Sequence, residues 1–383
     1  ITYGQALSDS SITGKMKDPN TGATVTGTFT WDTPAVNPNA GSHDAKWTFT
    51  PDKSYGGKYT TYTDTAPVTI NPKAVTVSGI TAKDKVYDGN TNATLDCSNA
   101  KLDGVLENDT LTVTATGTFE SANAGEQKVK ISGFKLGGDS AANYVPSTVH
   151  SQTETTATIT AKEVTVTITP NGGTYGSVTA AAAVLSGVVD GETVPVTLTY
   201  TGNGYNSTSV PTDVDSYTVT ASIADNNYIL TGKTIANFVI TPKAVTVSGI
   251  TAKGKAYDGT TDAVLDCSNA QFGGILGNDT LTVTATGTLE SADVGEQNVT
   301  ISNLTLGGNS VANYVLAESG NQTETTATIT AREATVTPDD NQFKVYEEKD
   351  PELTYKVSGV LDGETLKGIT LTRAEGENAG EYA

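Results

Sequence analysis

The sequence N-D-T-L-T-V-T-A-T-G occupies residues 108–117, and it occurs again unchanged at residues 278–287. From Leu111 onward apolar residues alternate with threonine, and this period of two is typical of a β-strand with one buried face. The run V-P-V-T-L-T-Y at residues 194–200 alternates in the same way. Turn residues separate such runs about every eight to twelve residues. The pattern therefore predicts an all-β chain built of sandwiches or barrels of antiparallel strands.

The chain is internally repetitive. A shift of 170 residues aligns residues 71–160 with residues 241–330, and 63 of these 90 positions are identical. A second pattern, S-G-V-V-D-G-E-T at residues 186–193, returns as S-G-V-L-D-G-E-T at residues 358–365. Self-similarity at this level predicts an array of copied modules rather than one large core.

The segments that join the copies are short and alike. They read V-T-I-N-P-K-A-V-T-V (68–77), A-T-I-T-A-K-E-V-T-V (157–166), F-V-I-T-P-K-A-V-T-V (238–247) and A-T-I-T-A-R-E-A-T-V (327–336). Proline forbids helix, so the last strand of one module should lead almost directly into the first strand of the next. We therefore predict five modules in the order A, B, A, B, A, which we name the first to the fifth module: a partial module at 1–72, then 73–161, 162–242, 243–331, and a partial module at 332–383.

Placed end to end, such modules would form an elongated rod. A sandwich of about 85 residues advances by about one strand length, ~25–35 Å at 3.3 Å per residue, which gives on the order of 100–170 Å for the chain. Residues 180–185 look helical by composition, but they align with the strand-like residues 352–357 and are interpreted as strand.

A tyrosine corner recurs near the start of each module. The corner reads K-V-Y-D-G-N-T (85–91), G-G-T-Y-G (172–176), K-A-Y-D-G-T-T (255–261) and F-K-V-Y-E (343–347), and the chain opens with I-T-Y-G. Glycine supplies a positive φ, aspartate accepts backbone N–H bonds and tyrosine packs its ring, so we interpret the corner as structural. The residues of this motif are Tyr87, Asp88, Gly89, Tyr175, Tyr257, Asp258, Gly259 and Tyr346.

No constellation of residues predicts catalysis, a metal site or a cofactor. The two histidines, His43 and His150, lie in different modules, and neither accompanies a Tyr-Asp-Gly corner. The D-G-E-T and N-D-T turns offer one or two carboxylates each, whereas a calcium site needs several oxygens. We therefore predict that the chain is not an enzyme. Cys97 and Cys267 share the context L-D-C-S-N-A in two copies and are expected to be unpaired.

Two further patterns repeat. The pairs Asn143-Tyr144, Asn227-Tyr228 and Asn313-Tyr314 are interpreted as turns, with an amide crosslink to Lys73, Lys162 and Lys243 as the alternative. An acidic or amide residue, a tight turn and then an aromatic resemble the tyrosine corner of immunoglobulin-like sandwiches. This second pattern occurs as N-A-G-S-H (39–43), N-A-G-E-Q (123–127), D-V-D-S-Y (213–217), D-V-G-E-Q (293–297) and N-A-G-E-Y (378–382).

Composition limits the partners. Forty-three acidic against 23 basic residues give a formal charge of −20, so the surface should repel nucleic acid and anionic lipid. Because no window approaches 18 consecutive apolar residues, we predict no membrane insertion in this segment.

These motifs resemble two families of bacterial repeat domains. The Tyr-Asp-Gly segments, with the downstream G-x-L-x-N-D-T and A-N-Y-V segments, resemble the YDG domain of surface and hemagglutinin-like proteins. Residues 346–365 resemble MBG-type domains, and G-T-F-T-W (27–31) with F-T-P-D (49–52) resembles Ig-like repeats of large clostridial surface proteins. The resemblance implies tandem Ig-like β-sandwiches, with a β-grasp as the alternative for the MBG type. Glu347 departs from the usual glycine, and Gln127 and Gln297 depart from the usual aromatic.

The resemblance also implies a function. We expect a non-enzymatic structural stalk or adhesive repeat region of a large bacterial cell-surface protein, extracellular and monomeric within a longer chain, with signal and anchor outside this fragment. The alternative is a set of modules that binds a glycan or a host or extracellular-matrix protein through loops at the sandwich ends or through an exposed strand edge.

Overall fold

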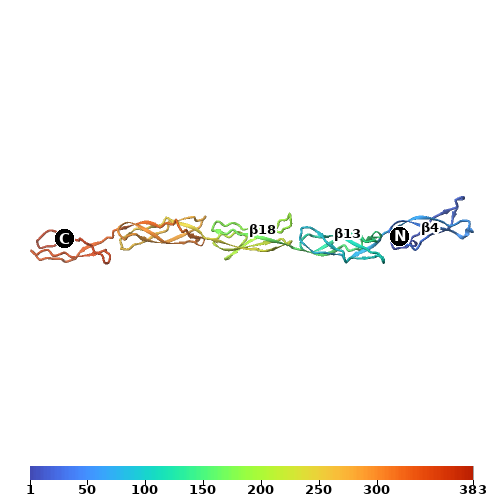
Figure 1. Cartoon of the computed structure of the whole chain (residues 1–383). Coiled ribbons are helices and arrows are strands. Elements are labelled where there is room, and N and C mark those ends of the chain that lie inside the picture. Colours follow the sequence, from blue (N-terminus) through green and yellow to red (C-terminus); the bar gives the residue numbers. More distant parts are fainter. Residues whose placement is uncertain (383) are drawn as a thin grey trace. The chain divides into compact units, whose positions relative to one another are not determined.

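The computed structural model describes residues 1–382, and within them every regular element is a β-strand or a short 3₁₀ helix (Figure 1). The 3₁₀ helices are η1 (Leu7–Asp9), η2 (Lys53–Tyr55), η3 (Ala141–Asn143) and η4 (Val311–Asn313). The chain folds into two compact units. Unit 1 comprises residues 1–167, 184–197 and 222–234, and unit 2 comprises residues 168–183, 198–221 and Ile235 onward.

Unit 1 begins with the first module, in which β4 is the long central strand (Figure 1). Its sheets have the orders β1-β2 and β3-β4-β5, with β1 (Met16–Lys17), β2 (Thr24–Val25), β3 (Gly27–Trp31), β4 (Gly41–Pro51) and β5 (Tyr62–Ile70). Trp31 is buried in a core with Leu7 and Ile70, and Trp47 packs against that core.

The second module is a two-layer sandwich. Its five-stranded sheet has the order β8-β15-β13-β12-β9, formed by β8 (Lys85–Val86), β9 (Asn92–Ala93), β12 (Thr112–Phe119), β13 (Gly125–Gly137) and β15 (Glu154–Thr160). The facing strands form the orders β11-β6-β14 and β10-β7, with β6 (Lys73–Ser78), β7 (Thr81–Ala82), β10 (Leu95–Asp96), β11 (Lys101–Asp103) and β14 (Tyr144–Pro146). Val77 of β6 packs with Val113 and Ile131 of the larger sheet, so apolar side chains of both layers form one core.

The strands of the third module are divided between the units. Unit 1 holds most of the sheet β18-β16-β22, with β16 (Lys162–Thr169), β18 (Ala182–Ser186) and β22 (Tyr228–Thr231). Unit 2 holds most of the sheet β17-β23-β21-β19-β20, with β17 (Gly173–Thr174), β19 (Val196–Gly202), β20 (Tyr205–Ser207), β21 (Asp215–Ile223) and β23 (Ile235–Thr241). Most of the segment 180–185, interpreted as strand, lies in β18.

The fourth module of unit 2 repeats the second strand by strand. Its sheets have the orders β29-β24-β32, β25-β28 and β26-β33-β31-β30-β27. The strands are β24 (Lys243–Ser248), β25 (Thr251–Ala252), β26 (Lys255–Ala256), β27 (Asp262–Ala263), β28 (Leu265–Asp266), β29 (Gln271–Gly273), β30 (Thr282–Leu289), β31 (Gly295–Gly307), β32 (Tyr314–Leu316) and β33 (Glu324–Thr330). In the fifth module β34 (Thr335–Pro338) pairs with β35 (Tyr355–Ser358).

The sheets are not purely antiparallel. β14 pairs with β6 in parallel, and β8 pairs with β15 in parallel. Parallel neighbours need a long connection, and nearly a whole module separates β6 from β14 in sequence. Each short strand is held at a sheet edge by a partner that local patterns do not identify.

The all-β class and the sandwich architecture are confirmed, and within residues 1–382 no α-helix crosses a sheet as a β-grasp requires. The same residues contain no helix of the length and hydropathy needed to span a membrane. Cys97 and Cys267 are free and half-buried. The five-module division and the rod stay predictions.

Candidate functional site

A four-residue turn recurs where one module meets the next, and we name it the acceptor loop. The four loops are residues 106–109, 189–192, 276–279 and 361–364. Each begins with leucine or valine and ends with aspartate or glutamate, whose backbone N–H donates to the carbonyl of the first residue at 3.0–3.1 Å. These are the N-D-T and D-G-E-T turns of the sequence, and each presents one carboxylate to the joint.

Beside three of these loops stands a tyrosine of the same module, the resident tyrosine. Its hydroxyl accepts the N–H of the first loop residue and donates to the carboxylate of the last. The distances are 2.9 and 2.5 Å for Tyr144 with Leu106 and Asp109, 3.1 and 2.6 Å for Tyr228 with Val189 and Glu192, and 2.9 and 2.6 Å for Tyr314 with Leu276 and Asp279. The Asn-Tyr motif therefore fixes the rotamer of the loop carboxylate.

The preceding module supplies a second tyrosine, the incoming tyrosine, which is the tyrosine of its own corner. It donates to the same carboxylate: Tyr3 to Asp109 at 3.0 Å, Tyr87 to Glu192 at 2.8 Å, Tyr175 to Asp279 at 2.9 Å and Tyr257 to Glu364 at 2.5 Å. In the first three, the incoming and resident rings meet edge to face with centroids 5.3–5.4 Å apart. Such pairs contribute about 0.5–1.5 kcal/mol beyond their buried area.

An asparagine side chain ties the same two modules together at a second point. Its Oδ1 accepts a backbone N–H of the preceding module: Ala40 to Asn143 at 2.8 Å, Ala124 to Asn227 at 2.8 Å and Val214 to Asn313 at 2.9 Å. Its Nδ2 donates to Asn39, Asn123 or Asp213 of that module at 3.2–3.3 Å. Both polar atoms of each amide are engaged, so a crosslink to Lys73, Lys162 or Lys243 gains no support. We call the two tyrosines, the loop and the asparagine the tyrosine joint.

The asparagine of the tyrosine joint is hydrogen-bonded to the turn that resembles an immunoglobulin tyrosine corner. In every copy the fifth residue bonds to the backbone carbonyl of the first. The distances are 3.0 Å for Tyr217 to Asp213, 2.7 Å for Tyr382 to Asn378, 3.0 Å for Gln127 to Asn123, 2.9 Å for Gln297 to Asp293 and 2.6 Å for His43 to Asn39. Glutamine and histidine thus bond to the same backbone carbonyl as the tyrosine hydroxyl does. The turn is therefore kept although the residue type changes.

The structure places the predicted motif residues in two groups. Tyr87, Tyr175 and Tyr257 are incoming tyrosines and lie at joints. Asp88 and Asp258 form local ion pairs with Lys85 and Lys255 and also accept backbone N–H bonds from residues 90 and 260, which brace the corner.

The corner at Tyr346 differs from the others. Tyr346 is 59% exposed, and Glu347 has a φ of +66°, so the backbone keeps the turn without glycine.

Sequence reasoning missed that these motifs belong together. It read the acidic turns, the Asn-Tyr pairs and the tyrosine corners as separate features. A usable signal existed, because each incoming tyrosine precedes its carboxylate by a nearly constant 104–107 residues.

Ionisation should control the joints. The hydroxyls of Tyr144 and Tyr314 lower the pKa of Asp109 and Asp279 below the ordinary 3.8. The bond to Glu192 and burial raise the pKa of Tyr87 to about 12, and burial with the bond to Asp109 raises that of Tyr144 to about 12.

We therefore expect joint stability to be flat between pH 3.8 and pH 10, the ordinary values. It is lost as pH falls through the lowered aspartate pKa values, and again as pH rises through the raised tyrosine values. Urea midpoints measured from pH 2 to 12 test this. Asp109→Asn should reduce the loss of stability at low pH. An unchanged pH profile in that variant would contradict the role given to the Asp109 carboxylate.

Two constraints favour glycine at the position that follows an incoming tyrosine: the backbone conformation and the space beside it. Gly176 has a φ of +81°, and a β-carbon built on it would overlap Cδ1 of Leu276 in the next acceptor loop. Gly204 has a φ of +83° with nothing within 4 Å of such a carbon. We expect Gly204→Ala to cost about 1–2 kcal/mol from backbone strain alone, and Gly176→Ala to cost more. Denaturant unfolding compares them, and Leu276→Ala should remove the excess. Equal costs for both glycines would show that the contact with Leu276 is unimportant.

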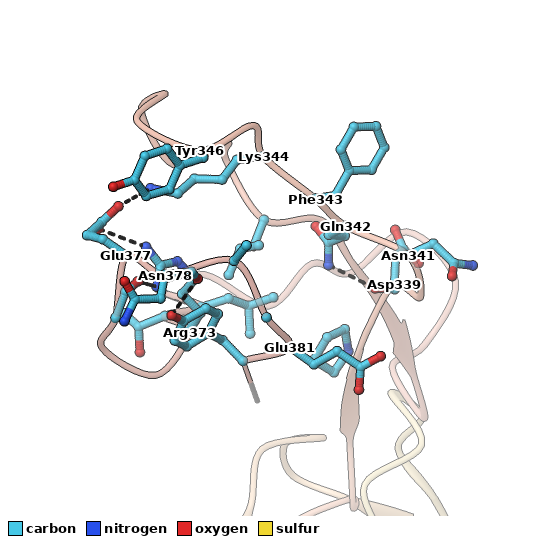
Figure 2. A pocket seen from close by; sticks show the side chains of 18 residues that line it. Asp339, Asn341, Gln342, Phe343, Lys344, Tyr346, Arg373, Glu377, Asn378 and Glu381 are labelled. Atoms are coloured by element: carbon cyan, nitrogen blue, oxygen red, sulfur yellow. Dashed lines mark hydrogen bonds and ion pairs between the residues drawn. The ribbon is translucent and has the colours of Figure 1, made fainter.

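A cavity of about 800 Å³ lies in the fifth module (Figure 2). Figure 2 shows Lys344, Arg373 and Glu377 joined at one side, while the 82% exposed Phe343 points away. Lys344 and Arg373 are each paired with both Asp350 and Glu377. These ion pairs engage both cationic side chains of the cavity, whose lining also includes the acidic Asp339 and Glu381, so we assign no ligand to it. Within residues 1–382 no group of three or more histidine, cysteine, aspartate and glutamate side chains could hold a metal ion.

Three family models match parts of the chain. The model of the YDG domain matches residues 71–154 and 241–324, that of the MBG domain (YGX type) matches residues 334–383, and that of the MBG domain matches residues 186–244. The chain contains tandem YDG and MBG domains. The YDG matches lie almost entirely in the second and fourth modules and the MBG matches in the third and fifth, so the resemblance inferred from the tyrosine corners is confirmed.

Other comparisons add less. The comparison with curated proteins found no match. Among solved structures, domains 4–9 of surface layer protein SbsC are similar with 12% identity and a TM-score of 0.19, over 92% of this chain and 66% of that chain. This likeness is too slight to support a conclusion about fold or function.

Proposed function

We propose that this chain is the repeat region of a bacterial cell-surface protein and acts as a non-enzymatic stalk that projects or attaches. The observation that carries the proposal is the tyrosine joint. Consecutive YDG and MBG domains meet through paired tyrosine rings, a shared carboxylate and an asparagine. These contacts restrict bending where a flexible linker would allow it.

The joints also bear on how the chain would attach to a partner. Loops at the sandwich ends, the alternative binding site, are covered at internal joints, since Leu106, Val189 and Leu276 face the preceding module. The partners we propose are glycans or host proteins, bound instead along exposed strand edges. β14, β22 and β32 lie at the edges of their sheets and expose Val145, Ile229 and Val315.

Small-angle X-ray scattering tests the stalk. We expect a maximum dimension on the order of 100–170 Å, from one strand length per module. A joint-breaking variant, Tyr228→Ala, should broaden the distance distribution without unfolding the fourth module. A compact particle would overturn the proposal. Labelling of intact bacteria that produce the whole protein tests the surface location, and a glycan array with the full chain tests the sugar partner.

A further inference from the structure

The joints differ in the type of incoming corner and in the residue that supplies the carboxylate, and the corner type correlates with the residue type. Where glycine directly follows the incoming tyrosine, as after Tyr3 and Tyr175, the acceptor loop ends in aspartate. Where one residue separates tyrosine from glycine, as after Tyr87 and Tyr257, the loop ends in glutamate. A longer corner therefore meets a longer side chain.

The resident tyrosine does not account for this difference, because it is placed alike in both kinds of joint. Its hydroxyl lies 2.9 Å from the first loop N–H in the two aspartate joints and 3.1 Å in the Glu192 joint. It donates to the carboxylate at 2.5–2.6 Å in all three. One carboxylate oxygen is thus fixed relative to the loop in the same way.

The incoming hydroxyl is received differently. In the aspartate joints its shortest bond goes to the oxygen that the resident tyrosine uses, Oδ2 of Asp109 or of Asp279, and Tyr3 has a second, longer contact of 3.4 Å with Oδ1 of Asp109. The other oxygen accepts a serine hydroxyl, from Ser140 at 3.0 Å or Ser310 at 3.1 Å. In the Glu192 joint the two oxygens are divided, with Oε1 for Tyr87 and Oε2 for Tyr228.

The longer corner thus delivers its hydroxyl to a second position, which only the longer side chain provides with an oxygen. Gly89 confirms how close this approach is, since a β-carbon built on it would lie 3.0 Å from Oε1 of Glu192. An aspartate at position 192 would be one methylene short. Its carboxylate could keep the bond to Tyr228 or reach Tyr87, but it could not meet both hydroxyls at the separate positions that they take on Glu192.

We propose that the length of the acceptor carboxylate is matched to the incoming corner, so that each joint selects the type of its neighbour. The outgoing end of a YDG domain fits an acceptor loop that ends in glutamate, and a Tyr-Gly corner fits a loop that ends in aspartate. The alternating order of YDG and MBG domains is then specified by the joints. This rule is independent of whether the chain is a stalk or an adhesin.

Two backbone amides report on docking directly. The N–H groups of Ala124 and Val214 bond to Asn227 and Asn313 across their joints, so their hydrogen exchange slows only when the domains are docked. In the full chain, Glu192→Asp should speed exchange at Ala124 about tenfold, the effect of losing one charge-assisted bond. Asp279→Glu should speed exchange at Val214 similarly. Glu318→Asp, at an exposed position away from the joints, should change neither.

In a shortened chain the rule predicts that Asp279→Glu has the opposite effect on amide protection at the joint from its effect in the full chain. Removing residues 162–242 joins Ala161 to Lys243 and keeps the Ala-Lys sequence of the joint. The Tyr87 corner then meets the Asp279 loop, a mismatch, and Ala124 should exchange at least about tenfold faster than in the full chain. Asp279→Glu should restore its protection, although the same substitution weakens the joint at Val214 in the full chain.

An effect of the same sign in both chains would overturn the rule, because carboxylate length would then belong to the module and not to the pairing. The amides of Val129 and Val299, in β13 and β31, show in the same experiment that both YDG domains are folded. If the shortened chain does not fold, the two full-chain substitutions decide, and unchanged exchange at Ala124 and Val214 refutes the matching.

Discussion

Replacing Tyr228 by alanine is expected to lower the free energy of unfolding of unit 1 by about 3–5 kcal/mol. Tyr228 is 4% exposed and belongs to a core cluster that includes Tyr87, Phe119 and Val164, so it joins two modules through apolar contacts as well as through its hydroxyl. Removal of the ring leaves a cavity. It also leaves Oε2 of Glu192 and the N–H of Val189 without the tyrosine hydroxyl.

Two further variants divide this effect. Tyr228→Phe keeps the ring and should cost about 1–3 kcal/mol, the range for a buried group left without its hydrogen-bond partner. Tyr62→Ala, at an exposed tyrosine of the same unit whose ring packs against Trp47, should cost only about 0.5–1.5 kcal/mol. Urea unfolding gives all three values. A Tyr228→Ala variant as stable as Tyr62→Ala would mean that the joint contributes nothing to the stability of unit 1.

Phe119→Ala is the second substitution with a large expected effect, again about 3–5 kcal/mol. Phe119 is 2% exposed and is among the largest fully buried side chains, at the end of β12. The repeat supplies the control, because the equivalent position of the fourth module is Leu289, which is equally buried. Phe119→Leu should therefore cost less than about 1.5 kcal/mol.

Calorimetry of the two variants tests this comparison. The second module should lose stability in Phe119→Ala and nearly keep it in Phe119→Leu. Equal losses would show that the two cores, although built from the same strands, are packed differently around this position.

Much of the fold could be predicted because it is local. The alternation at residues 111–117 gives β12, and its exact copy gives β30, since burial of one strand face leaves a period of two in the sequence. Tyr217 and its carbonyl partner Asp213 lie four residues apart, so that turn was recognisable as well. Gln127 was harder, because the bond to the carbonyl is retained while the residue type changes.

The joint could not be predicted in the same way. Tyr87 was identified as a structural residue, but its partners Glu192 and Tyr228 lie in another module, and no local pattern connects them. The parallel partner of β6 was missed for a similar reason. β14 is three residues long, too short to show a period, and it is held by a strand that begins about seventy residues earlier.

The pairing of the terminal strands has a mechanical consequence. β6 begins beside Tyr144 at the incoming end of the second module, and β15 finishes beside Tyr87 at the outgoing end. A tension transmitted along the chain therefore enters and leaves parallel to these strands. It loads the ladders of β6 with β11 and β14, and of β15 with β13, in shear, so that several hydrogen bonds must fail together rather than unzip one at a time.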